Sequence, residues 1–369
     1  MKRFLFIEPY HGGSHREFAE GLIKHSSHHI DILSLPDRNW QWRLSGSALY
    51  FARQGFRFED YDGIIVSGLL RLSDLKALGG KSFPPVLVYF HETQLTYPAP
   101  LNQKKGNGSE HPMTDISTAL CADLVVFNSG YHRDAFLKAI CDFMERVPDY
   151  PLKRVAEDIG EKSRVLYPGV DFPESAQRVT GELEPSAPLV IWNHRWNYDK
   201  NAPSFFYAAE TLMKDGVDFR LAILGECPGE RIPDIFIKAK DTFGTRIVQF
   251  GYAPDRKTYF TWLEKGSMVV STAIQENFGM SMVEAMACGC LPLLPDRLSY
   301  PEILPGRFHD LFLYRNQKEL ISKFRKILGM THQSSPLRKE MAKAMELFSW
   351  KSRISEYDGI LEHLSRKGR

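Results

Sequence analysis

Residues 268–290 read Met268-Val-Val-Ser-Thr-Ala-Ile-Gln-Glu-Asn-Phe-Gly-Met-Ser-Met-Val-Glu-Ala-Met-Ala-Cys-Gly-Cys290. The apolar run at the start predicts a buried strand, and the later apolar run, which contains Glu284, predicts a helix. Gly279 permits a tight turn between them, so the first N–H groups of the helix can face a phosphate. Glu276 and Glu284 lie eight positions apart and are placed to bind sugar hydroxyls. We interpret this stretch as part of a nucleotide-sugar site.

The alternation of short apolar runs with helical patterns continues through the whole chain. Continuous apolar runs of this kind are typical of strands buried on both faces of a parallel sheet. The runs predict strands at 3–8, 29–35, 63–67, 85–90, 124–128, 164–167, 189–193, 219–224, 247–250, 268–272, 291–294 and 311–313. Helices are expected at 14–24, 131–144 and 336–366. The pattern predicts an α/β fold with doubly wound sheets.

A segment without periodicity divides the chain into two α/β halves. Residues 172–188 contain three prolines and one glycine, which indicate a linker. We predict an N-terminal Rossmann-like domain at 1–178, a second at 179–348, and a C-terminal helix with a basic tail at 349–369 that returns to the first domain. The two domains are expected to face each other across a cleft, with ligands at the carboxyl ends of the strands.

Composition and residue spacing argue against a zinc-binding protein and a membrane-spanning protein. A hydrophobic fraction of 43%, a charged fraction of 25% and a net charge of +2 are ordinary for a soluble globular protein. The five cysteines have no zinc-ligand spacing, which favours reduced thiols in the cytoplasm. No apolar run approaches the roughly 20 residues that span a membrane, so we expect no membrane insertion. Residues 318–369 hold 12 Lys and Arg against 6 Asp and Glu, which fits a solvated helix face or contact with nucleic acid or acidic lipid.

Polar residues follow several of the predicted strands in the first half. Gly12 and Gly13 form a turn after the first strand that could contact a diphosphate or sugar, and Ser14 could cap the helix that follows. The alternative is a plain strand-to-helix turn. His91 follows the fourth strand and is the first of several polar residues there, although a lone histidine is more often structural. The other polar and aromatic candidates near these strand ends are His15, Gln94, Tyr97 and Asn128.

The second half begins with two cations and continues to the opening stretch. Arg195 and Lys200 follow a buried strand, where a guanidinium fork and an ammonium suit a diphosphate. The turn amides predicted to face that phosphate belong to Phe278, Gly279, Met280 and Ser281. Asp60 and Asp62 form a D-x-D, but it precedes the third strand and reads as turn chemistry, so no metal is predicted.

Together these residues resemble glycosyltransferase family 4, whose members share the GT-B fold. Glu276 and Glu284 match its E-x₇-E motif, and Arg195 and Lys200 match its diphosphate-binding cations. Residues 11–15, 35–43, 46–48 and 94–98 look more specifically like the tRNA-queuosine α-mannosyltransferases. This resemblance implies GDP-mannose as donor and the queuosine of an aspartate tRNA as acceptor.

The resemblance implies a retaining, metal-independent transferase without a cofactor. His91 and Glu276 would be catalytic, and the donor would contact Gly12, Gly13, Arg195, Lys200, Phe278, Gly279, Met280, Ser281 and Glu284. The acceptor would contact Ser14, His15, Trp40, Trp42, Arg43, Gln94, Tyr97 and Asn128. The tryptophans could instead belong to a core. A family 4 enzyme acting on lipid or polysaccharide, and a non-catalytic nucleotide-sugar or RNA-binding module, stay as alternatives, and the oligomeric state is left open.

Overall fold

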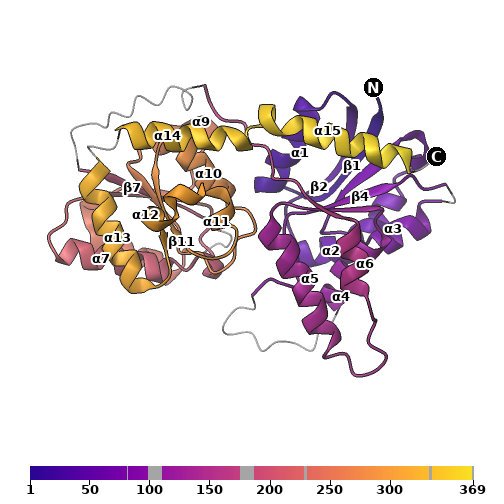
Figure 1. The fold of residues 1–369 in the computed structure, drawn as a ribbon, viewed down its shortest axis with the longest axis horizontal. Helices are drawn as coiled ribbons and strands as arrows, with labels where there is room; N and C mark the ends of the chain where they lie inside the picture. Colours follow the sequence, from indigo (N-terminus) through magenta and orange to yellow (C-terminus); the bar gives the residue numbers. More distant parts are fainter. Residues whose placement is uncertain (81, 99–109, 175–186, 228–230, 332–334, 368–369) are drawn as a thin grey trace. The chain divides into compact units, whose positions relative to one another are not determined.

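The computed structural model describes residues 1–80, 82–98, 110–174, 187–227, 231–331 and 335–367. The chain forms two compact units (Figure 1). Unit 1 comprises Met1–Val170 together with Trp350–Arg369, and unit 2 comprises Asp171–Ser349. The C-terminal segment therefore belongs to the same unit as the N-terminus.

Unit 1 is built on a six-stranded parallel sheet with the order β2-β1-β3-β4-β5-β6. Its strands are β1 (Arg3–His11), β2 (His29–Pro36), β3 (Gly63–Ser67), β4 (Val86–Phe90), β5 (Leu124–Phe127) and β6 (Ser163–Val165). Its helices are α1 (Gly13–His25), α2 (Trp40–Ala52), α3 (Leu72–Leu78), α4 (Glu110–Cys121), α5 (Gly130–Met144), α6 (Val155–Glu161) and α15 (Trp350–Arg366). The chain leaves β1 toward β2 and returns to place β3 on the other side, so the switch point of the sheet lies between β1 and β3.

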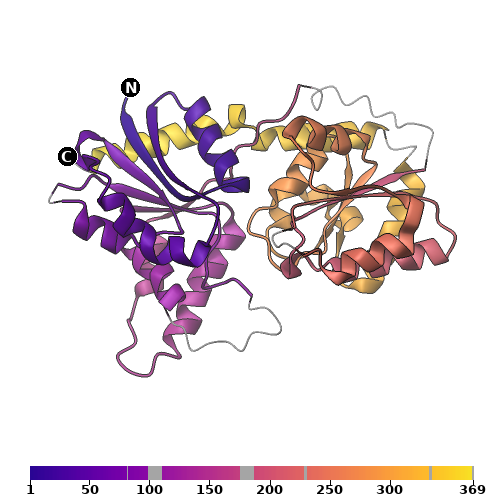
Figure 2. The same cartoon turned by 180° about the vertical axis from the view of Figure 1, so that it is seen from behind.

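Helices cover both faces of this sheet, because successive side chains of a strand point to opposite sides. Leu5 and Ile7 of β1 pack with residues of α2 to α6. Phe4 and Phe6 pack on the opposite face with α1 and α15. In Figure 1 α15, in yellow, crosses this second face in front of the strands, and Figure 2 shows it behind them. Tyr357 of α15 fixes it there, since its hydroxyl donates to the Tyr167 carbonyl at 3.0 Å.

Unit 2 has a second six-stranded parallel sheet, with the order β12-β11-β10-β7-β8-β9. Its strands are β7 (Leu189–Asn193), β8 (Arg220–Leu224), β9 (Ile247–Gly251), β10 (Met268–Val270), β11 (Leu291–Pro295) and β12 (Leu313–Tyr314). Its helices are α7 (Ala202–Lys214), α8 (Asp234–Phe243), α9 (Arg256–Lys265), α10 (Met280–Ala287), α11 (Tyr300–Ile303), α12 (His309–Phe312), α13 (Gln317–Met330) and α14 (Ser335–Met345). The switch point of this sheet lies between β7 and β10.

The predicted doubly wound α/β fold is confirmed, and a few local predictions are wrong. The strand expected at 311–313 begins only at Leu313, because Leu311 ends up in the short helix α12. The helix expected at 336–366 is interrupted by a 3-10 turn at Glu346–Phe348. Within the described ranges, none of the helices combines the length and apolar character that crossing a bilayer requires.

Candidate active site

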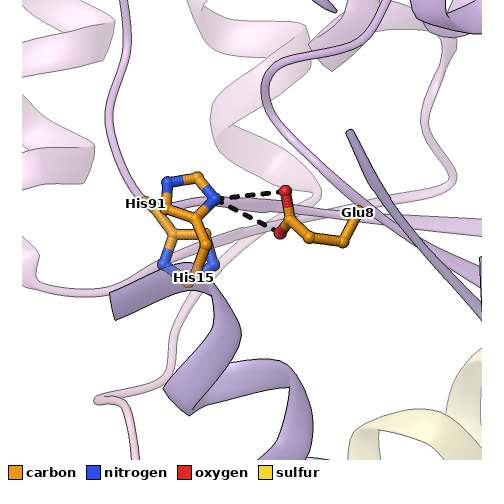
Figure 3. A group of neighbouring side chains, drawn as sticks. All are labelled: Glu8, His15 and His91. Carbon is orange, nitrogen blue, oxygen red and sulfur yellow. Dashed lines mark hydrogen bonds and ion pairs between the residues drawn. The ribbon is translucent and has the colours of Figure 1, made fainter. Parts of the chain in front are cut away.

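A buried carboxylate marks the switch point of unit 1. Glu8, near the end of β1, is fully buried, and its Oε1 accepts hydrogen bonds from the Tyr10 N–H at 2.9 Å and the Ser67 hydroxyl at 3.0 Å. His15 Nδ1 lies 3.2 Å from both carboxylate oxygens (Figure 3). This contact joins the His15 ring to the carboxylate through Nδ1. Glu8 therefore joins β1, β3 and the first turn of α1.

The geometry of α1 explains why His15 reaches this carboxylate. Gly12 is the residue before the helix and Gly13 adopts φ +49°, so the chain turns sharply from strand to helix. The prediction that Ser14 caps α1 is wrong: Ser14 lies inside the helix and is exposed, and the N-cap position belongs to Gly12. The helix starts one residue earlier than expected, at Gly13. The predicted contact of Gly12 and Gly13 with the donor stays a prediction.

His91, which follows β4, lies against His15. The two ring centroids are 4.1 Å apart with a tilt of 32° (Figure 3). Burial lowers the pKa of His91 well below its usual value, and the neighbouring rings of His15 and His132 lower it further. His91 is therefore a neutral imidazole near pH 7, able to take part in hydrogen bonding without carrying charge.

Asn128 and His132 support the His91 loop. The Asn128 amide donates to the His91 carbonyl at 2.9 Å, and its oxygen accepts from His132 Nδ1 at 2.8 Å. Burial lowers the pKa of His132 to about 3, so this ring is also neutral. The structure thus gives Asn128, a predicted acceptor contact, a role in holding the backbone at His91. Sequence reasoning did not single out His132, although it lies one helical turn after Asn128.

The loop that carries Gln94 and Tyr97 is tied to helix α4. Asp115 Oδ2 accepts the backbone N–H of Gln94 at 2.6 Å and that of Leu95 at 3.1 Å. Burial raises the pKa of Asp115 to about 8 although these hydrogen bonds oppose the shift. The side chains of Gln94 and Tyr97 are half-buried. Asp115 is a second residue that sequence reasoning missed, because its partners lie about twenty positions away.

Three ligand-type side chains lie close together in unit 1. One atom each of Glu8, His15 and His91 falls within 4.8 Å of the others. The rings of His15 and His91 lie against each other, and the carboxylate already accepts hydrogen bonds from Tyr10 and Ser67. Within the group, His15 contacts the carboxylate of Glu8 and the ring of His91. Of the D-x-D, Asp62 binds Lys2 and the Arg3 N–H at the amino-terminal edge of the sheet, as expected.

The tryptophans of residues 40–43 lie on the surface of helix α2. Trp40 is 36% exposed and Trp42 is 68% exposed, so the core alternative is wrong. Trp40 starts the helix and its ring lies 5.5 Å from that of His111 on α4. Arg43 donates to the Pro36 carbonyl at 3.3 Å. These side chains are presented outward next to the carboxyl end of β2.

In unit 2 the predicted cations follow β7, beside its switch point. Lys200 is buried, and its Nζ lies 2.8 Å from the Gln275 carbonyl, 3.2 Å from Glu276 Oε2 and 3.1 Å from Asp199 Oδ2. Burial works to lower the pKa of Lys200, but the carboxylates of Glu276 and Asp199 prevail and raise it. Lys200 therefore stays charged. Arg195 is exposed and close enough for its charge to act on Lys200.

The turn between Glu276 and helix α10 has the predicted form. Gly279 precedes the helix with φ +96°, and a Cβ there would lie 3.2 Å from Ile303 and 3.3 Å from Tyr300. The Gly279 carbonyl accepts the N–H groups of Met282 and Val283, so the N–H groups of residues 279–281 come before the first hydrogen bonds of the helix. Gly289, with φ +84°, closes the far end of the helix.

Glu284, in the second turn of α10, is held by two residues that sequence reasoning missed. Arg256 Nη1 lies 2.8 Å from its Oε1, and the Tyr259 hydroxyl donates to its Oε2 at 2.9 Å. The Asn193 amide, at the end of β7, donates both to the Tyr259 oxygen and to the Ser281 carbonyl at 2.9 Å. Arg256 and Tyr259 lie three positions apart on α9, a spacing that places them on one helix face.

Comparison with known proteins agrees with this geometry. Residues 3–170 match the family model described as tRNA-queuosine alpha-mannosyltransferase N-terminal, and residues 175–347 match Glycosyl transferases group 1. A tRNA-queuosine alpha-mannosyltransferase of Drosophila melanogaster is 37% identical over 310 residues, which cover 82% of this chain and 81% of the relative.

Solved structures of more distant proteins share the fold. Sucrose-phosphate synthase from Thermosynechococcus elongatus superposes with a TM-score of 0.70 at 15% identity over 100% of both chains. Anabaena HepE in complex with UDP and glucose superposes with a TM-score of 0.66 at 15% identity, over 98% of this chain and 100% of that chain. The architecture is that of the GT-B glycosyltransferases. With the identity to the Drosophila protein, it follows that this chain belongs to the tRNA-queuosine α-mannosyltransferase family of glycosyltransferases.

Proposed function

We propose that this protein transfers mannose from GDP-mannose to the queuosine base of a tRNA, with retention of configuration at the sugar. The observation that carries the proposal is the donor-type site of unit 2, where Lys200, Glu276 and the Gly279 turn meet at one switch point. The Drosophila relative's name supports the choice of mannose and queuosine. A tRNA substrate and five unpaired cysteines support a cytoplasmic location.

The donor diphosphate is proposed to bind Lys200, Arg195 and the N–H groups at the start of α10. Phosphate is favoured there by the positive end of the helix dipole and by the two cations. Lys200 would exchange an oxygen partner for the phosphate, and Glu276 is the partner best able to leave because its side chain is 19% exposed. Charge that develops on the departing diphosphate would then be stabilised by groups already in place.

Glu284 is proposed to bind the ribose of the nucleotide. Each of its oxygens already accepts one hydrogen bond, from Arg256 and from Tyr259. A carboxylate has about four lone-pair sites, so it can also accept ribose hydroxyls. The two partners would hold the carboxylate in one orientation, which reduces the entropy lost on binding.

The acceptor hydroxyls are proposed to bind near His91 in unit 1. The neutral imidazole can orient a hydroxyl of the queuosine ring without adding charge. In the transfer, the bond from the sugar C1 to the phosphate oxygen breaks and a bond from C1 to the acceptor oxygen forms. The acceptor proton passes to the departing phosphate, so GDP and mannosyl-queuosine are the products.

Retention through front-side attack fits the state of the carboxylates. A covalent glycosyl-enzyme intermediate needs a carboxylate placed to attack C1. Glu8 is fully buried and bound by Tyr10, Ser67 and His15. Glu276, once the phosphate replaces it on Lys200, is proposed to bind hydroxyls of the transferred sugar. We therefore assign proton acceptance to the phosphate and propose that no metal or cofactor takes part.

The test is incubation with radiolabelled GDP-mannose and tRNA that either contains or lacks queuosine. Label is expected only in the queuosine-containing tRNA, and turnover is expected to survive EDTA. Label found instead in a lipid or polysaccharide fraction would overturn the assignment of tRNA as the acceptor. Strong inhibition by EDTA would overturn the metal-free mechanism. A panel of nucleotide sugars in the same assay identifies the donor.

A further inference from the structure

A hollow with a volume of about 230 Å³ lies between helix α2 and the end of strand β2. It is separate from the Glu8, His15 and His91 group, none of whose side chains lines it. Trp42, Tyr50, Arg38 and Arg43 form its walls together with Gly46. Its residues come from positions 35–50 of unit 1, so a single short segment builds it.

Helical spacing aligns the aromatic residues of the hollow. Trp42, Gly46 and Tyr50 follow one another at intervals of four, which places them on one face of α2. A Cβ on Gly46 would lie 3.2 Å from the Trp42 ring, so glycine lets the indole lie close against the helix. Trp42 is 68% exposed and Tyr50 is 50% exposed. The helix thus presents two flat aromatic surfaces to solvent beside a recess.

The charged residues that line the hollow are both arginines. Residues 38–58 contain four arginines and no lysine, aspartate or glutamate. Arg38 and Arg43 line the hollow, and Arg43 is held at its rim by the Pro36 carbonyl. Asp37, the acid that precedes the segment, places its carboxyl group where a Cβ on Gly12 would lie. Flat aromatic surfaces flanked by guanidinium groups are complementary to a base and its phosphates.

We propose that this hollow binds an unstacked nucleobase of the acceptor RNA, one that is not itself modified, with Trp42 and Tyr50 stacking on the base and Arg38 and Arg43 binding the adjoining phosphates. The proposal rests on the proposed function, because a tRNA acceptor supplies the single-stranded loop in which bases can unstack. A lipid chain suits the hollow less well, since two guanidinium groups line it. The site would contribute to tRNA affinity and leave the chemistry of transfer unchanged.

The experiment measures tRNA affinity by filter binding and compares it with donor affinity by calorimetry. Trp42→Ala is expected to weaken tRNA binding about 5- to 150-fold, with Trp42→Phe retaining most of it. Arg43→Gln is expected to lower the slope of log K against log salt by about one. GDP-mannose affinity should not change in any of these variants. Leu49→Ala is the matched control, because Leu49 is 49% exposed on the same helix and does not line the hollow.

The outcomes separate this site from the function on which it rests. Unchanged tRNA affinity in Trp42→Ala, with normal mannose transfer by the native protein, overturns the nucleobase site and leaves the function standing. Trp42-dependent tRNA binding without any mannose transfer supports the site and sinks the function. Loss of binding to phosphatidylglycerol vesicles in Trp42→Ala, with tRNA affinity intact, assigns the surface to a membrane and also overturns the proposal.

Discussion

Replacing Glu276 by glutamine separates its two roles, as a partner of Lys200 and as a contact of the transferred sugar. In the structure, Glu276 Oε2 lies 3.2 Å from the ammonium of Lys200, which also contacts Asp199 and the Gln275 carbonyl. Glutamine keeps the shape of the side chain and removes its charge. The variant therefore weakens one of three contacts to a buried cation without creating a cavity.

The size of the stability change follows from the hydrogen bond that is altered. A hydrogen bond to a charged group contributes about 1.5–3 kcal/mol and a neutral one about 0.5–1.5 kcal/mol. Because the Glu276 side chain is 19% exposed, water compensates part of the loss, and we expect about 1 kcal/mol. In a domain of this size, that lowers the unfolding temperature of unit 2 by about 2–4 °C.

GDP affinity should be kept or increased while turnover falls. Without the Glu276 charge, Lys200 is held less tightly and an anionic diphosphate is repelled less, so GDP affinity should be equal or higher. Turnover with GDP-mannose should fall about 10- to 100-fold, because a charged hydrogen bond to the sugar is lost in the transition state.

Calorimetric titration with GDP, initial rates of mannose transfer and scanning calorimetry provide the three readouts. Glu210→Gln is the control, since Glu210 pairs with Lys214 on the exposed surface of α7 and such pairs contribute only about 0.3–0.5 kcal/mol. A tenfold loss of GDP affinity in Glu276→Gln, with turnover at saturating donor unchanged, would refute the reasoning. Glu276 would then only brace Lys200.

Three further substitutions test other parts of the two units. Glu284→Gln should weaken GDP binding about tenfold in calorimetry through loss of a charged ribose contact, and unchanged affinity would contradict the ribose assignment. The pKa of Asp115 is about 8 in the folded protein, above its unfolded value. Its contribution to the free energy of unfolding is therefore full below about pH 4 and is lost as pH rises through 8. In urea unfolding, the stability of Asp115→Asn should not show that decline with pH. A pH profile equal to that of the native protein would contradict the raised pKa of Asp115. The pKa of His132 is about 3 in the folded protein. Its contribution to the free energy of unfolding is therefore full above about pH 6.5 and is lost as pH falls toward 3. His132→Asn should reduce the acid-side slope by about 1.4 kcal/mol per pH unit, and an equal slope would count against a neutral buried ring.

Local patterns in the sequence were enough to predict the strands and the turn at Gly279. Continuous apolar runs predicted strands such as β3 and β7 with their observed bounds. Gly279 identified the entry to α10, because a positive φ strongly favours glycine. The wrong secondary-structure predictions concern short elements. The two-residue strand β12 carries too little periodicity to be distinguished from the neighbouring helix α12.

The supporting residues of each site were beyond sequence reasoning because their contacts are long-range. Glu8 lies 59 positions from Ser67, and they meet only because β1 and β3 are neighbours in the sheet. Glu284 is 28 positions from Arg256, and their pairing depends on the packing of α10 against α9. No periodicity or spacing within either segment encodes such a pairing.

The sequence by itself determined the alternating α/β architecture and the glycine turn at 279, and it led to the prediction that Lys200, Glu276 and Glu284 bind the donor. These depend on backbone preferences and on side-chain chemistry within a few residues. Only the tertiary structure decided that Glu8 orients His15 beside His91 and that Trp42 lies open on α2. Strand order and helix packing fix those positions, since they bring together groups that the chain itself keeps apart.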